Sequence, residues 1–385
     1  MLVVVAALMI LTTLLTDISF SARVRVLTAA HERDELQAYY LAQSGINIYR
    51  LVLMANRQIS RNSMFKPYLE AAGIPPGDAL WKMVPMINTG LMRMLFVADE
   101  GDVSDAEAEQ FAQTGEVSAE VSEQSREEGG GRFTGRNFLD FPGDFATEVR
   151  GEDCRANVNL FATASSEQVT QETTMGPVIY GLMSGEENLQ WLRERNLEPW
   201  DLISNLRDWV DADNMRSTTS GGYEDDLYNR LDSPYLAKNA RFDTPAEIRL
   251  VDGWQDEVFE KFGGELSIYG GGKIDINCAS DEMLKGLLRS NVTTPLTESD
   301  LDRLVSDFHT QLDTAQGAIT NGKQLKSWLE GLGYGVRPEL PNLISSSATF
   351  FTLTSTGQSG GATVRITAVV EYSTDEGKVL YWRVD

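Results

Sequence analysis

Acidic side chains gather in one short stretch of the chain, where they could bind a metal ion. Seven carboxylates lie between residues 201 and 226: Asp201, Asp208, Asp211, Asp213, Glu224, Asp225 and Asp226. Calcium prefers six to eight oxygen ligands, several of them carboxylates from one loop. Asp211 and Asp213 flank one alanine, which places both on one side of a turn. The glycines before Glu224 allow it and Asp225 to fold back onto them.

The spacing is not that of an EF-hand. In that loop the sixth position is glycine and the twelfth is glutamate. Counted from Asp211, these positions hold Arg216 and Gly222. From these residues alone, a calcium site and a solvated acidic loop both stay open as interpretations.

The sequence offers few residues for catalysis. Paired carboxylates serve glycosidases and metal-dependent nucleases, but no basic phosphate clamp or histidine accompanies them here. The chain has two histidines, His31 and His309, and neither lies beside a nucleophile motif. We therefore expect no enzymatic activity and no small-molecule substrate. The two cysteines, Cys154 and Cys278, are too few for a zinc site. They form one disulfide if the head is periplasmic, or else remain two separate buried thiols.

Charge argues against nucleic acid as a partner. The 385 residues include 57 acidic and 33 basic side chains, for a net charge of −24. Nucleic-acid-binding proteins instead present clustered lysine and arginine. The run from Ile274 to Ala279 is similar to the entry of helix-hairpin-helix modules, which bind DNA. The glycine-rich hairpin that those modules need is missing after Leu288.

The N-terminal region predicts a membrane anchor continued by a stalk. Met1 to Thr16 carries no charged side chain, and Arg23 and Arg25 close the apolar region. The pattern then continues as an amphipathic helix, with no proline and only Gly45 as a breaker. We expect one helix from about Leu2 to Ile59. A cleaved signal peptide would instead have a basic segment before the apolar run.

The elements that follow predict an α+β fold. Alternating residues indicate strands at 145–150 and 157–161, and three more in the last forty residues, at 349–356, 363–372 and 378–384. Between them the pattern is helical, with predicted helices at residues 184–195, 199–212, 244–252, 281–289, 298–312 and 322–332. The expected architecture is a long N-terminal helix, a small antiparallel sheet, and a large helical domain inserted in the sheet.

Five regions are predicted along the chain. They are a transmembrane helix at 1–22, a stalk helix at 23–60, the first part of the head at 61–165, an inserted helical domain at 166–345, and C-terminal strands at 346–385. Residues 99–131 form an acidic, glycine-ended insertion within the head. Its composition predicts disorder, because so few apolar residues cannot support a core.

Motifs spread over nearly the whole chain resemble the minor pseudopilin K family of the bacterial type II secretion system. The most specific lie between Leu206 and Ala279, in the segments Leu206–Asp213, Glu224–Tyr228, Lys238-Asn239, Thr244–Gly253 and Ile274–Ala279. Others are the apolar start, Tyr40–Ile46, and the segment Glu152–Leu160. The family's prepilin leader, a short basic segment ending in glycine, is not seen before the apolar run, so either Met1 is an internal start or the numbering begins past the cleavage site.

The resemblance implies a pilin-like fold and a place at the tip of the pseudopilus, in complex with minor pseudopilins I and J. It implies a single-pass protein of the bacterial inner membrane, in contact with its lipid, with a periplasmic head and with methylation as a modification. It also implies structural calcium in the helical domain, with Asp211, Asp213, Glu224 and Asp225 as ligands. The family lacks the usual glutamate near the fifth mature position, and the first acid here is Asp17.

Two other functions fit part of the sequence. A minor type IV pilin, acting as an adhesin or assembly primer, would share the helix and sheet but not the block at residues 208–213. A membrane-tethered DNA receptor would need a basic patch and a glycine hairpin.

Overall fold

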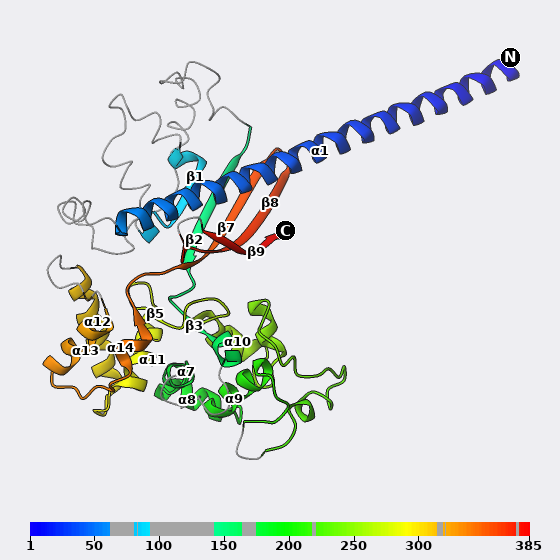
Figure 1. Ribbon diagram of the computed structural model, residues 1–385. Helices are drawn as coiled ribbons and strands as arrows, with labels where there is room; N and C mark the ends of the chain where they lie inside the picture. Colours follow the sequence, from blue (N-terminus) through cyan, green and yellow to red (C-terminus); the bar gives the residue numbers. More distant parts are fainter. Residues whose placement is uncertain are drawn as a thin grey trace, which may run out of the picture.

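The computed structural model describes residues 1–61, 81–82, 84–92, 142–163, 175–217, 221–313, 319, 321–374 and 377–385. A long helix, α1, lies across a five-stranded sheet and projects far beyond it (Figure 1). A helical domain lies on the other side of the sheet from this helix. The predicted fold class, a pilin-like helix and sheet with an inserted helical domain, is therefore confirmed.

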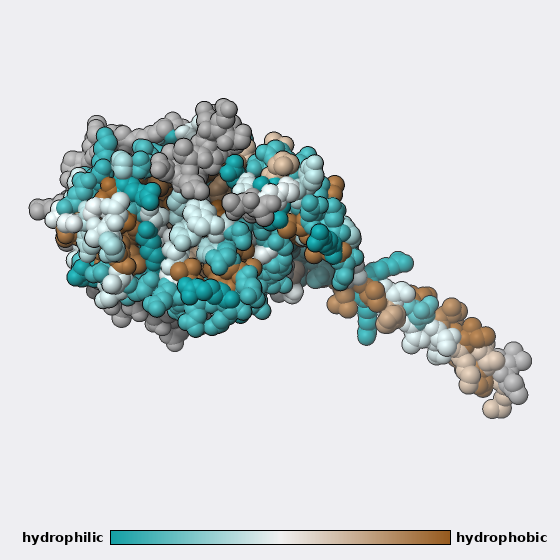
Figure 2. All heavy atoms as spheres, turned by 90° about the horizontal axis from the view of Figure 1, so that it is seen from below, coloured by the Kyte–Doolittle hydropathy of each residue, from teal (hydrophilic) through white to brown (hydrophobic). Residues whose placement is uncertain are grey.

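Helix α1 runs without a break over Leu2–Arg61, as expected from the lack of proline. Its first third is exposed and apolar, and Figure 2 shows this part projecting from a mostly hydrophilic head. Of the helices described, it alone contains a stretch that is long and apolar enough to cross a membrane, with a mean hydropathy of 1.9. No residue of that stretch is buried, which fits a single-pass anchor.

From Ala38 onward, α1 packs on the sheet at very short range. A Cβ at Gly45 would lie 2.1 Å from the Thr147 hydroxyl, and one at Gly357 would lie 2.0 Å from the Ala38 carbonyl oxygen. Both glycines are required for this close approach. The helix therefore lies directly over the strand that contains Gly357.

The sheet is antiparallel, with strand order β1-β2-β7-β8-β9. Its strands are β1 Met86–Asn88, β2 Asp144–Gly151, β7 Phe350–Ser359, β8 Ala362–Glu371 and β9 Lys378–Val384. Strand β2 and the three C-terminal strands confirm the predictions from alternation. The short edge strand β1 was not predicted, because three residues are too few for a pattern.

The helical domain is built from short elements between β2 and β7. Its helices are α7 Gly176–Met183, α8 Glu186–Arg193, α9 Pro199–Val210, α10 Asp256–Phe262, α11 Asp281–Asn291, α12 Glu298–Asp313, α13 Gly322–Gly331 and α14 Leu340–Leu343. Single 3₁₀ turns are η2 Val158–Thr163, η3 Glu224–Leu227, η4 Pro245–Leu250 and η5 Gly263–Glu265. Two parallel two-residue pairs complete it: β3 Ala156–Asn157 with β4 Leu266–Ser267, and β5 Ile274–Asp275 with β6 Ile344–Ser345.

Two element predictions were wrong. The strand expected at residues 157–161 ends at Asn157, where the side-chain oxygen accepts a hydrogen bond from the Asn159 amide at 2.9 Å. This local bond turns the chain into η2. The α-helix expected at 244–252 is the 3₁₀ helix η4, which ends in extended backbone at Val251. Helices α7, α10 and α14 were not predicted. The acidic insertion 99–131 lies outside the described residues and stays a prediction.

A buried polar junction joins the sheet to the helical domain. Asp153 is buried, and its carboxylate accepts hydrogen bonds from the backbone amides of Thr349, Phe350 and Gly271 at 2.6–3.1 Å. Cys154, next to it, forms a disulfide with Cys278, with Cα atoms 5.3 Å apart. Of the two alternatives left open for the cysteines, the structure therefore has the disulfide. The junction fixes where the helical domain enters and leaves the sheet.

Candidate calcium site in the helical domain

The candidate site lies where α9 ends and a returning loop meets it. Asp211 is the C-cap of α9, in extended conformation, and its amide donates to the Arg207 carbonyl. The chain then doubles back, because Met215 and Tyr223 form an antiparallel bridge and the Arg216 amide donates to the Gly222 carbonyl at 3.0 Å. This hairpin brings the start of η3 onto the end of α9, as the glycines suggested.

Three of the four predicted ligands converge. Asp211, Asp213 and Glu224 each offer a carboxylate oxygen, and these oxygens lie within 4.8 Å of one another. Two oxygens bound to one calcium ion at 2.3–2.6 Å can be at most about 5 Å apart. The spacing of the three carboxylates therefore fits one cation.

Two of these carboxylates lack the hydrogen bonds that buried acids need. Glu224 is 1% exposed, and neither of its carboxylate oxygens has a hydrogen-bond partner among the described residues. The Oδ1 atom of Asp211 is likewise buried without one, although its Oδ2 lies 3.6 Å from the Arg207 guanidinium. Buried polar atoms are nearly always paired. Oxygens left over at the meeting point of three acids fit a hard cation.

The electrostatics point the same way. Burial, and then the charges of Asp211 and Asp208, raises the pKa of Glu224 to about 8. Burial and the neighbouring acids raise the pKa of Asp211 to about 6. A bound cation would favour the ionised forms and offset this repulsion. With no cation, these carboxyls take up protons well above their ordinary pKa values.

Asp213 and Asn239 hold the loop in shape. Asp213 is exposed, and its Oδ1 accepts from the Met215 amide at 2.8 Å. Asn239 donates from its side chain to the Asp213 carbonyl at 2.8 Å and also hydrogen bonds Asn214. It adopts a positive φ of 48°, and its buried Oδ1 has no partner among the described residues. Asn239 thus ties the loop after α9 to a residue more than twenty positions further along the chain.

Asp225 lies next to Glu224 in sequence but faces elsewhere. Its Oδ1 accepts a hydrogen bond from the Ala237 amide at 3.0 Å, and it is not among the three converging acids. Asp208 is a buried acid that was not predicted as a ligand. It lies one turn before Asp211, and its carboxylate accepts a hydrogen bond from the Ser217 amide at 3.0 Å. Its position on the buried face of α9 is the feature that could have pointed to Asp208 in the sequence.

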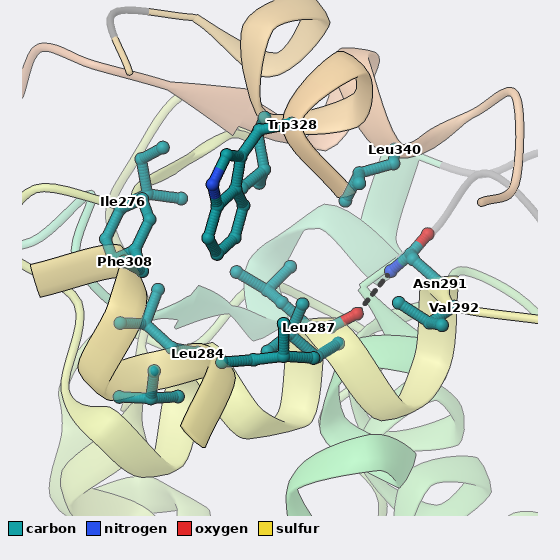
Figure 3. Close-up of a pocket in the computed structure, with 12 residues that line it drawn as sticks. Ile276, Leu284, Leu287, Asn291, Val292, Phe308, Trp328 and Leu340 are labelled. Atoms are coloured by element: carbon teal, nitrogen blue, oxygen red, sulfur yellow. Dashed lines mark hydrogen bonds between the residues drawn. The ribbon is translucent and has the colours of Figure 1, made fainter. Parts of the chain in front are cut away.

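An apolar cavity lies in the other half of the helical domain. Leu284, Leu287 and Val292 of the α11 region line it together with Phe308 and Trp328 (Figure 3). Its volume is about 20 Å³, the space of one water molecule. The Asn291 side chain, which also lines it, donates to the Leu287 carbonyl at 3.0 Å. This cavity is a packing gap too small for a ligand.

Fold and site together define a class: a membrane-anchored, pilin-like protein with a helical domain that carries a candidate metal site. Residues 157–269 match the family model described as type II secretion system (T2SS), protein K. The type II secretion system protein K of Pectobacterium carotovorum subsp. carotovorum is 28% identical over 189 residues, 48% of this chain and 57% of that relative. Both matches are to the type II secretion system protein K family, the family that the motifs of the sequence resemble.

The match therefore spans less than two thirds of the curated relative. Among solved structures, the GspK-GspI-GspJ complex from the enterotoxigenic Escherichia coli type 2 secretion system is also similar. The TM-score is 0.42 at 16% sequence identity, covering 64% of this chain and 81% of that one.

Proposed function

We propose that this protein is a structural minor pseudopilin at the tip of the type II secretion pseudopilus, which acts in filament assembly and protein export. The match of residues 157–269 to the family model supports a role in the secretion system, and the resemblance supports the tip position and the partners, minor pseudopilins I and J. The observation that most supports the proposal is the arrangement of α1. This one helix packs on the head and leaves its apolar first third exposed. Such a surface has no use in a free monomer.

The same fold supports a proposal for the compartment of the head. Arg23 and Arg25 close the apolar part of α1, so the head lies on one side of the membrane. Disulfides persist in the periplasm and are rare in the cytosol. The Cys154–Cys278 bond therefore supports a periplasmic head on an inner-membrane anchor.

A secretion assay tests the role. In a host lacking its own copy, the full chain is expected to restore export of the secreted proteins. A variant deleted for residues 2–15 should fail to do so and should leave the membrane fraction as a soluble head. The helical domain provides the matched control, since an exposed substitution such as Leu332→Ser should not reduce export. Full export by the anchor-deleted variant contradicts the proposal.

We also propose that the helical domain binds structural calcium through Asp211, Asp213 and Glu224. The converging oxygens and the unpartnered Glu224 carboxylate support this proposal. When bound, calcium would neutralise the charge of the carboxylates and fix the loop. The chain's own residues hold that loop in shape by capping it and by hydrogen bonding to it. Asp225 was predicted as a fourth ligand, and its substitution best tests which of the acids bind the ion.

A further inference from the structure

Strand β9 ends the sheet on one side, and its outer edge has no partner among the residues that the structure describes. Proteins usually protect such an edge by keeping it short, charged or covered. The opposite edge, β1, is three residues long, whereas β9 has seven and lies beside the C-terminus (Figure 1). None of its residues is buried, and Trp382 and Val384 are 37% and 46% exposed. The edge of β9 is therefore open to a further strand.

The backbone hydrogen bonds show which groups of β9 face outward. Arg365 of β8 and Asp385 exchange two backbone hydrogen bonds at 2.9 Å, so the backbone of Asp385 faces β8. In an antiparallel ladder, residues that face the neighbouring strand alternate with residues that face away from it. The register is regular from Tyr381 to Val384. The N–H and C=O groups of Trp382 and Val384 therefore point away from β8, toward the position of an added strand.

The side chains of β9 differ between the two faces of the sheet. Val379, Trp382 and Val384 lie opposite β8 residues that are buried in the core under α1. Directly opposed side chains point to the same face, so these three lie on the face that carries α1. Lys378 and Arg383 are exposed on the other face. The edge is thus apolar on one face and basic on the other.

An added strand that matches these two faces has two kinds of side chain in alternation. Cross-strand pairs are stabilising between apolar residues and between opposite charges. Apolar residues would therefore lie opposite Trp382 and Val384, with an acid opposite Arg383. Arg383 already pairs with Asp385 at 2.7 Å, but both side chains are exposed, and such surface pairs contribute little. In a molecule of net charge −24, this edge offers basic partners to an acidic segment.

A second copy of β9 fits poorly at this edge. Antiparallel pairing through Trp382 and Val384 of both copies would place the two Arg383 side chains directly opposite each other. Like charges in that position destabilise a strand pair. The occupant is therefore a segment of different sequence, with acids in place of the basic residues.

We propose that the outer edge of β9 binds an extended segment of another protein in which apolar and acidic residues alternate. The segment adds to the five-stranded sheet as a further antiparallel strand. Its apolar residues exchange hydrogen bonds with Trp382 and Val384 on the face of α1, and its acids face Lys378 and Arg383. Strand addition of this kind takes its affinity from main-chain hydrogen bonds and its selectivity from alternate side chains. This surface goes beyond the proposed function and does not depend on it.

Peptide binding tests the edge directly. The full-length chain is purified in detergent and titrated into a short labelled peptide of alternating valine and glutamate, with fluorescence anisotropy as the readout. We expect saturable binding, which weakens by about tenfold or more when lysine replaces glutamate. N-methylation of the valine amides, which would face β9, should abolish binding. N-methylation of the glutamate amides, which would face away from β9, is the matched control and should not.

Charge reversal in the protein supplies the second measurement. The double variant Lys378→Glu, Arg383→Glu should bind the glutamate peptide about tenfold more weakly and should now prefer the lysine peptide. Lys323→Glu, at an exposed position of α13, is the control and should bind like the wild type. Lys378→Glu alone decides if the melting temperature shows that the double variant does not fold.

Three results would contradict the proposal. Wild type that does not bind the glutamate peptide overturns it outright. Equal binding of the peptide with N-methylated valines overturns strand pairing, and an unchanged preference in the folded charge-reversed variant overturns the acidic partner. None of these results alters the export that the proposed function predicts, which is measured separately.

Discussion

Two groups of buried acids in this protein contrast in how their oxygens are satisfied. At the junction, the Asp153 carboxylate accepts from three backbone amides and from the Thr349 hydroxyl. In the loop after α9, Glu224 is equally buried, yet neither of its oxygens has a partner among the described residues. A chain that satisfies one buried acid so fully leaves the other open for a ligand. The first acid holds the fold, and the second lies at the centre of the calcium site that we propose.

Removing the satisfied acid should have the largest effect. Asp153→Ala removes the acceptor of three backbone amides, of which those of Thr349 and Phe350 belong to half-buried residues and that of Gly271 to an exposed one. An amide left without a partner away from water costs about 1–3 kcal/mol, so the free energy of unfolding should fall by at least about 2 kcal/mol, with or without calcium, as measured by chemical denaturation. Asp153→Asn, which keeps one acceptor oxygen, should cost less. A loss below ~1 kcal/mol for Asp153→Ala would mean that the junction does not hold the domains together.

Calcium should stabilise the wild-type head. Binding to the folded state alone contributes about 2.7 kcal/mol at a hundredfold excess over Kd. The melting temperature should rise on adding calcium and fall with chelator, and the double variant Asp211→Asn, Asp213→Asn should abolish that response. Magnesium at the same ionic strength is the control for screening. A melting temperature that stays constant across the titration returns the cluster to a solvated acidic loop.

Glu224→Gln should change the melting temperature in opposite directions in chelator and in calcium. In chelator, Glu224 must take up a proton or stay charged among its acidic neighbours when the head folds, because its pKa is raised to about 8. A neutral amide removes that cost, so the variant should melt at or above the wild type, by about 3 °C for ~1 kcal/mol. In calcium the order should reverse, because the ligand is gone. Thermal melts of both proteins in both buffers measure this crossing. If Glu224→Gln is less stable than wild type in chelator as well, the carboxylate has a structural partner and the contrast with Asp153 fails.

Asp225→Asn should have the smallest effect. The amide oxygen can still accept from the Ala237 amide, so the calcium-induced rise should stay within about 0.5 kcal/mol of the wild type. The same calcium titration checks it, with Asp211→Asn as the positive control. A lost response would restore Asp225 as a ligand, as the sequence predicted.

Local signals in the sequence predicted much of the fold. The bounds of α1 followed from the absence of breakers, and the C-terminal strands from their alternation. The three converging acids were also predicted, because the glycines at 221 and 222 indicated a returning loop. These features depend on neighbours in sequence.

Features that depend on distant residues were missed or left open. Asp153 bonds residues almost two hundred positions away, which no spacing reveals. The cysteines are 124 residues apart, so their pairing could not be decided. Glu224 and Asp225 are adjacent and chemically alike, and only the turn of η3 makes one converge with Asp211 while the other binds Ala237.

The disulfide has a mechanical consequence. A subunit pushed or pulled within a filament carries load along its covalent chain, and Cys154–Cys278 offers that load a shorter route than the residues between them. Tension entering at β2 therefore passes straight to α11 and bypasses the whole stretch that contains Asp211, Asp213 and Glu224. The candidate cation site lies in the part of the chain that the disulfide bypasses, so tension along the backbone does not pull its ligands apart.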